Sequence, residues 1–270
     1  MRNAGTIKFS QDSGGGSLTV FHDDNTTLQD AVILLASKLM VERARDALWY
    51  AIDHLRRYPK LGGNWNEVVD GLAYNCFKYT AEDWPAKPHD MDIMRRIFIK
   101  TLNGILGNQI VVIEDLSEVK AAGATGIIKD KKEIEKRQDE GNTAGLTRVR
   151  EAGQSQPIYW LASSVRIDWA TLRELSQWYP AVQVYIHEAT HKHAGTADAF
   201  YIHSLKMLPD TSVAASYEAG EKSPKQSLKN ADSYAWFAYT LWQRLTTLAK
   251  TEGQAISSED KKLRKARVGR

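Results

Sequence analysis

Residues 187–191 read His-Glu-Ala-Thr-His and place two histidines four positions apart, with a glutamate directly after the first. Side chains four positions apart share one face of a helix, so both imidazoles can bind one Zn²⁺ while Glu188 lies beside a water on the metal. This HExxH pattern is typical of metal-activated hydrolases. We expect His187 and His191 to be metal ligands and Glu188 to be the general base. The alternative is a helix whose two histidines only border a polar patch.

A catalytic zinc takes three protein ligands, so one more acid or histidine is required. The longer motif HExxHxxGxxH is excluded because alanines occupy positions 194 and 197. Glu218 or Glu221 could supply the third ligand from a later helix. The nearer candidate is Asp198, because Gly195 can end the first helix and reverse the chain toward the two histidines.

The residues around Asp198 favour a second short helix over residues 197–205, with Thr196 as its cap. Such a helix would place Tyr201 one turn after Asp198, so one segment would deliver a ligand and a phenol. His193, two positions past His191, points away from the ligand face and is expected to be exposed at the helix end.

Three segments in order carry a family resemblance: HExxH at 187–191, Gly-Thr-Ala-Asp-Ala-Phe-Tyr at 195–201, and Asn-Ala-Asp-Ser-Tyr at 230–234. Over residues 180–240 the chain resembles the aspzincin metallopeptidases, the deuterolysin and peptidyl-lysine metalloendopeptidase family. The resemblance implies a zincin-like fold and a Zn²⁺ cofactor held by His187, His191 and Asp198. It also implies that Glu188 is the general base and that Tyr201 stabilises the oxyanion.

Asp232, in the third segment, has two candidate roles. In lysine-specific members of this family an acidic pocket receives the lysine, and Asp232 is placed to supply part of such a pocket. Position 235 is an alanine where those enzymes carry a second acid. The resemblance therefore implies a preference for Lys or Arg after the cleaved bond, without strict selection. Equally, Asp232 could orient a zinc-binding histidine from behind.

The chain around these motifs predicts an α+β fold, mostly helical, with a small sheet and the HExxH segment on an active-site helix. Extended segments are expected within residues 6–21, as a hairpin turning through glycines 14–16, and at 109–113 and 157–167. Helices are expected at 27–55, 66–79, 89–106, 169–178, 181–193 and 223–248. An extended peptide could add to an edge strand of that sheet beside the zinc helix.

We expect three regions: residues 1–150, a helical N-terminal region of unknown role; residues 151–250, the zincin-like catalytic region; and residues 251–270, a basic tail. The first boundary rests on a loop-like stretch at 141–153. Six of the last ten residues are Lys or Arg and none is acidic, in a chain of net charge +3. Because this basicity is confined to the tail and lacks interleaved aromatics, a nucleic-acid partner is not expected.

Composition excludes several other classes of protein. With 43% hydrophobic and 26% charged residues, a chain of 270 residues can form its own core. Its longest apolar run, Ala31–Ala36, is too short to span a bilayer. The single cysteine, Cys76, excludes an intramolecular disulfide, and the N-terminus lacks the apolar segment of a secretory signal. We therefore expect synthesis in the cytoplasm.

A zinc-dependent endopeptidase, with a protein or peptide substrate, is the function that these observations favour. Without a signal peptide or disulfides, it could be a toxin effector that a signal-independent system delivers into a target cell. A cognate inhibitor or immunity protein would then be expected. The alternative class is a catalytically inactive, zinc-stabilised binding module whose N-terminal half makes the contacts. The presence of Glu188 favours the enzyme.

Overall fold

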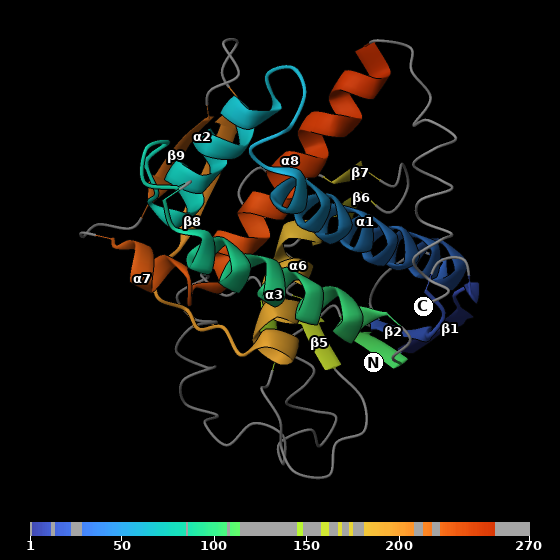
Figure 1. Ribbon diagram of the computed structural model, residues 1–270. Helices are drawn as coiled ribbons and strands as arrows, with labels where there is room; N and C mark the ends of the chain where they lie inside the picture. Colours follow the sequence, from blue (N-terminus) through green and yellow to red (C-terminus); the bar gives the residue numbers. More distant parts are fainter. Residues whose placement is uncertain are drawn as a thin grey trace.

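A computed structural model of the protein describes residues 2–11, 14–22, 29–84, 86–106, 109–113, 145–147, 158–161, 167–168, 173–174, 181–207, 213–217 and 222–251. These residues form a mixed α/β fold of packed helices with small sheets, in agreement with the α+β expectation (Figure 1). The expected region boundary at residues 150 and 151, Glu218, Glu221 and tail residues 252–270 lie outside the described residues.

Six helices are described, and local sequence explains several of their ends. α3 begins with a proline, whose fixed φ suits a first helical position. α1 ends at Arg57, and the next residue, Tyr58, is extended, as a residue directly before a proline prefers. In α7, Ser223 and Gln226 form a capping box. The helices are α1 (Asp30–Arg57), α2 (Trp65–Phe77), α3 (Pro88–Ile105), α6 (Ala181–Ala194), α7 (Pro224–Ser227) and α8 (Ala231–Thr251).

Helix α6 lies at the centre of the molecule and contacts α1, α3 and α8 (Figure 1). Every residue from Ala181 to His191 is buried, so this helix has no solvent face along that length. Next to it, Tyr234 of α8 packs edge-on against Phe77 and Phe98, with ring centroids 4.9 and 5.2 Å apart. Aromatic pairs of this kind stabilise a fold by about 0.5–1.5 kcal/mol each beyond their buried area. The described parts of the N-terminal helices and of α6 and α8 therefore share one hydrophobic core.

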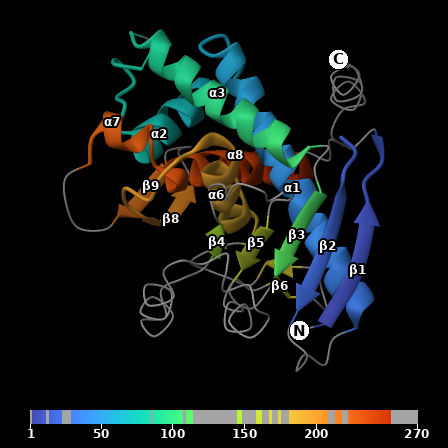
Figure 2. The same ribbon diagram turned by 90° about the horizontal axis from the view of Figure 1, so that it is seen from below.

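The largest sheet has five strands in the order β1-β2-β3-β5-β4. The expected N-terminal hairpin is present as an antiparallel pair, and β2, β3 and β5 run parallel, with β4 antiparallel to β5. Figure 2 shows the β1, β2 and β3 end of this sheet against α1 and the β5 and β4 end beside α6. The strands are β1 (Arg2–Lys8), β2 (Ser17–His22), β3 (Gln109–Ile113), β4 (Gly145–Thr147) and β5 (Ile158–Leu161).

Two further pairs of strands are small: β6 (Ile167–Asp168) with β7 (Arg173–Glu174), and β8 (Ile202–Met207) with β9 (Val213–Tyr217). The prediction of a helix over residues 197–205 is therefore wrong, since residues 202–207 form a strand. The described part of the helix expected over 169–178 is also a strand, β7. The helix expected over 223–248 is interrupted at residues 228–230, between α7 and α8.

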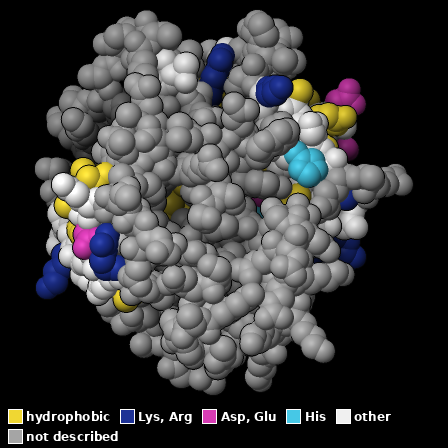
Figure 3. All heavy atoms as spheres, turned by 180° about the vertical axis from the view of Figure 1, so that it is seen from behind, with side chains coloured by type: hydrophobic (Ala, Val, Ile, Leu, Met, Phe, Trp, Pro, Cys, Tyr) yellow, Lys and Arg dark blue, Asp and Glu magenta, His cyan; other side chains and the backbone are white. Residues whose placement is uncertain are grey.

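Among the helices of the described chain, none is both long and apolar enough to cross a membrane. On the face shown in Figure 3, the described side chains of Lys and Arg lie in small separate groups, next to hydrophobic and acidic ones.

Candidate metal centre

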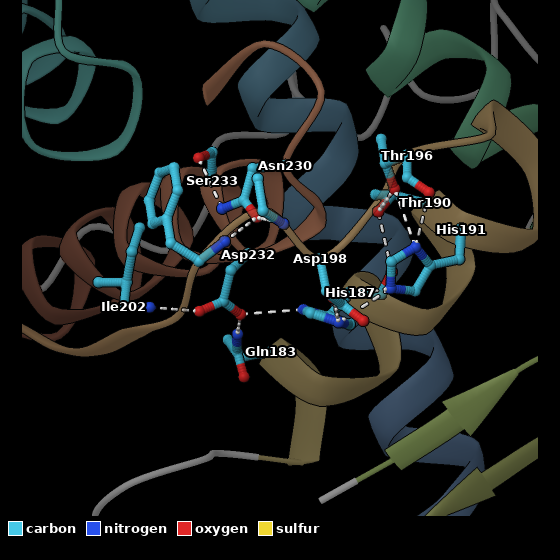
Figure 4. Close-up of polar contacts among 12 residues, drawn as sticks. Gln183, His187, Thr190, His191, Thr196, Asp198, Ile202, Asn230, Asp232 and Ser233 are labelled. Carbon is cyan, nitrogen blue, oxygen red and sulfur yellow. Dashed lines mark hydrogen bonds and ion pairs between the residues drawn. The ribbon is translucent and has the colours of Figure 1, made fainter. Parts of the chain in front are cut away.

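Two histidines of α6 and one aspartate of the following loop bring three ligand atoms together (Figure 4). The Nε2 atoms of His187 and His191 are 3.0 Å apart. Oδ1 of Asp198 lies 3.0 Å from Nε2 of His187 and 3.1 Å from Nε2 of His191. The structure thus brings together the three residues that the motifs suggested as ligands.

The geometry of the chain between residues 187 and 198 follows from the helix and its end. The two imidazoles are one turn apart on α6, with ring planes at 81° and centroids 4.7 Å apart. Gly195 then takes a φ of +71°, a left-handed conformation that glycine adopts without strain. Its N–H donates to the carbonyl of His191, and the N–H of Thr196 donates to that of Thr190. The chain reverses at this point and returns Asp198 to the histidines.

The outer nitrogens of both rings face atoms that can only accept hydrogen bonds. Nδ1 of His187 lies 2.9 Å from a carboxylate oxygen of Asp232, and Nδ1 of His191 lies 2.8 Å from the carbonyl oxygen of Thr196. Each Nδ1 must therefore carry the proton, and the Nε2 of each neutral ring presents a lone pair. Two such lone pairs and the carboxylate of Asp198 repel one another unless a cation lies among them.

The three atoms fit a zinc ion. Zinc binds nitrogen and oxygen at about 2.0–2.1 Å in tetrahedral geometry, which separates neighbouring ligand atoms by about 3.3 Å. The observed separations of 3.0–3.1 Å need an adjustment of only a few tenths of an ångström. The side chain of Asp198 is 34% exposed, against 9% and 11% for the two histidines. The cluster is therefore more open to solvent on the side of Asp198 than on the side of the histidines.

Electrostatics in the metal-free protein agree with a cation site. Burial lowers the pKa of His187, but its hydrogen bonds to Asp198 and Asp232 outweigh burial and hold it well above 6.5. His191 has a raised pKa for the same reason, with Asp198 as the partner. Burial raises the pKa of Asp198, yet the two histidines bring it far below its usual value. A positive charge among these three side chains is therefore favoured, and a metal ion would supply it.

Glu188 is 4% exposed and follows His187 on α6. Burial raises its pKa to about 7, an increase that the charges of His187 and His191 limit and that Asp198 and Asp232 reinforce. Because these four groups act on its pKa, the carboxyl group belongs to the same electrostatic cluster as the ligands. Tyr201 is also close, since its ring lies parallel to that of His187 at 12°, with centroids 6.2 Å apart.

Asp232 lies behind His187, on the side away from Asp198 (Figure 4). One of its oxygens accepts from Nδ1 of His187 and Nε2 of Gln183, at 2.9 and 2.8 Å, and the other accepts from the N–H of Ile202 at 2.6 Å. With three hydrogen bonds and 1% exposure, this carboxylate has little capacity left for a substrate ammonium group. The geometry favours the orienting role over the basic pocket.

The motif analysis gave no role in the metal centre to four residues that help to build it. The hydroxyl of Thr190 donates to the carbonyl of His187 and therefore accepts from the hydroxyl of Thr196, 2.7 Å away. Asn230 holds the loop that carries Asp198, and Gln183 holds Asp232. Asn230 stands two positions before Asp232 in the third motif, and that proximity was the available signal. Thr196 was expected to cap a helix that does not exist.

His193 is not the exposed residue that the sequence suggested. It lies against Gly104 of α3, so closely that a Cβ added at position 104 would stand 2.1 Å from its Cγ. Its ring therefore takes part in the packing of α3 against α6.

No family model matches the chain, and no curated protein matches it in sequence.

Proposed function

We propose that the protein is a zinc-dependent endopeptidase of zincin-like fold, in which His187, His191 and Asp198 hold the metal. The observation that carries the proposal is the meeting of three lone-pair atoms within 3.1 Å of one another, with both outer ring nitrogens engaged elsewhere. A nonspecific polar patch would not need fixed tautomers, whereas a metal site does. The family resemblance over residues 180–240 supports the same ligand set.

In the proposed reaction, Glu188 is the base and the acid. It takes a proton from the water that attacks the peptide carbonyl and later gives that proton to the leaving amine, so protons balance over the cycle. A zinc ion held by His187, His191 and Asp198 would supply a Lewis acid, which would lower the pKa of water toward neutral pH and polarise the carbonyl. Tyr201, stacked beside His187, donates a hydrogen bond to the developing oxyanion.

The sheet supports an extended peptide as the substrate. β4 is the last strand of its sheet among the strands that the structure describes, and both β4 and β5 contact α6. An extended chain can add to such an edge through backbone hydrogen bonds, which hold it straight beside the metal ligands. An endopeptidase needs this arrangement because it must bind residues on both sides of the cleaved bond.

The competing class, a zinc-stabilised binding module without activity, would use the same three ligands. The two classes differ in what Glu188 does. We expect the zinc-loaded protein to cleave a mixed protein substrate, and Glu188→Gln to lower the rate by about 10²–10⁴-fold, the usual contribution of a general base. Cleavage is measured by mass-spectrometric mapping of the products, and bound zinc by elemental analysis of the same samples.

The control is the metal content of the variant. Glu188→Gln should retain one zinc per chain, because Glu188 is not a ligand. A wild-type protein that binds zinc and cleaves no peptide would support the binding module instead. Delivery as a toxin and a cognate inhibitor stay predictions from the sequence, and the same cleavage map tests the predicted preference for Lys or Arg.

A further inference from the structure

The loop that carries Asp198 is hydrogen-bonded to the start of α8 on both sides of Asp198. The N–H of Ala197 donates to the carbonyl of Lys229 at 2.8 Å, and the carbonyl of Ala197 accepts from the N–H of Ala231 at 2.9 Å. After Asp198, the N–H groups of Ala199 and Phe200 both donate to Oδ1 of Asn230, at 3.0 and 3.2 Å. Hydrogen bonds to residues 229–231 therefore hold the chain on both sides of Asp198.

Asn230 occupies the position directly before α8, where a side-chain oxygen usually accepts from N–H groups of its own helix. Its amide oxygen has two lone pairs, and both are taken by Ala199 and Phe200. Its NH₂ group donates to the hydroxyl of Ser233 at 3.1 Å, which fixes the orientation of the amide. The oxygen of a helix-capping residue is therefore used to hold the metal loop.

The backbone of this loop has no helical or strand partner of its own between residues 198 and 201. Without Asn230, the N–H groups of Ala199 and Phe200 would lose their acceptor. Ala199 is exposed, but Phe200 is only 2% exposed, so water does not readily replace the acceptor of its N–H. A buried N–H without an acceptor is costly, so the loop would move to satisfy it, and Asp198 would move with it.

We propose that Asn230 is a positioning residue that sets the place of Asp198 and thereby the metal affinity of the centre. The inference rests on the proposed metal site but not on peptidase activity. It gives a role to Asn230, the first residue of the third motif, to which the resemblance assigns none. The start of α8 then positions two of the proposed ligands: Asn230 positions Asp198, and Asp232 positions His187.

The test compares Asn230→Ala with Asn75→Ala. Asn75 is also a buried asparagine, and its NH₂ group donates to the backbone carbonyls of Gly71 and Val213, neither of which belongs to the metal loop. Both variants should therefore lower the melting temperature. Zinc affinity, measured by competition with a chromophoric chelator, should fall about 10–100-fold in Asn230→Ala alone, as for partners that orient ligands in other metal sites.

Two further measurements separate positioning from general loosening. Asn230→Asp keeps an oxygen that accepts the same two N–H donors, so it should hold zinc at least as well as the wild type. In the metal-free protein, hydrogen exchange of a peptide covering residues 196–202 should speed up in Asn230→Ala and stay unchanged in Asn75→Ala.

Zinc binding by Asn230→Ala equal to that of the wild type overturns the inference, and so does an equal loss in Asn75→Ala. A wild-type protein that binds no zinc overturns both this inference and the proposed function. Zinc binding without peptide cleavage overturns the peptidase alone and leaves the role of Asn230 standing.

Discussion

Gly104→Ala is expected to disturb the contact that holds α3 against the end of the metal-binding helix. A Cβ at this position would lie 2.1 Å from Cγ, 2.2 Å from Nδ1 and 2.6 Å from Cδ2 of His193. Carbon atoms in contact stand about 3.5–4.0 Å apart, so the ring must move by more than about 1 Å. Cγ is the root of the ring, and rotation of the ring about its own bond does not move it. Either the ring leaves its place, or α3 and α6 separate.

Two opposing terms set the size of the effect. Overpacking of this kind costs about 1–3 kcal/mol, while alanine favours a helix over glycine by about 1 kcal/mol. In the wild-type background we expect Gly104→Ala to destabilise the protein by up to about 2 kcal/mol. Each kcal/mol lowers the melting temperature by roughly 2–4 °C. In a His193→Ala background the clash is removed and only helix propensity remains. The same substitution should then stabilise the protein.

The assay is a double-mutant cycle of four proteins, followed by thermal and urea unfolding. A second measurement follows the ring itself. Burial, and then the charge of Lys192, lowers the pKa of His193 to about 4. Displacement of the ring in Gly104→Ala should raise that pKa toward its ordinary 6.5, which an NMR titration detects. If Gly104→Ala stabilises both backgrounds, or leaves the pKa of His193 unchanged, the close approach of the two helices is refuted.

Three further predictions concern the metal. Asp198→Ala removes a proposed ligand, so it should reduce zinc affinity by more than the roughly 10–100-fold that loss of a ligand's hydrogen-bond partner costs. Calorimetric titration with zinc measures the affinity, and an unchanged value would exclude Asp198 as a ligand. Asp232→Ala should weaken zinc binding by about 10–100-fold and leave any preference for Lys or Arg after the cleaved bond unchanged. If the variant lost that preference and kept its zinc, Asp232 would instead belong to a substrate pocket. Zinc affinity should fall as the pH is lowered, and the fall should begin above pH 6.5. The raised pKa values of His187 and His191 let protons compete with zinc, while Asp198 stays ionised. Competition titrations at pH 8, 7 and 6 would show a flat profile if the histidines were not ligands.

The helices were predictable from sequence where their signal is local. The hydrophobic spacing from residue 28 to 55 indicated α1, and Gly195 marked the end of α6. The proximity of His187 and His191 was also predictable, because the distance between residues four apart on a helix is set by the helix alone. Asp198 could be proposed because a glycine reversal after a helix leaves few places for the next residues.

Residues 197–205 were misjudged because their hydrogen bonds are not local. Alanine and aspartate after a threonine favour a capped helix, in which each N–H donates to a carbonyl four residues earlier. Here the N–H groups of Phe200 and Ile202 donate instead to side chains of Asn230 and Asp232. The contact of His193 with Gly104 is non-local in the same way, since the two residues stand 89 positions apart and no periodic pattern connects them. Tertiary partners override propensity in both cases.

The two histidines and the aspartate of the proposed metal site are held by different means, and this difference should decide which substitutions change metal affinity. His187 and His191 lie on a helix that α1, α3 and α8 enclose, so their separation is preset by packing and changes little unless the core changes. Asp198 lies on a partly exposed loop, and its place depends on hydrogen bonds to residues 229–231. Changes at the start of α8 should therefore alter zinc affinity in addition to stability, whereas changes around α6 should alter stability first. Asn230 belongs to the start of α8, and Gly104 packs against α6. Measuring zinc affinity and melting temperature for substitutions at both positions therefore tests this difference directly.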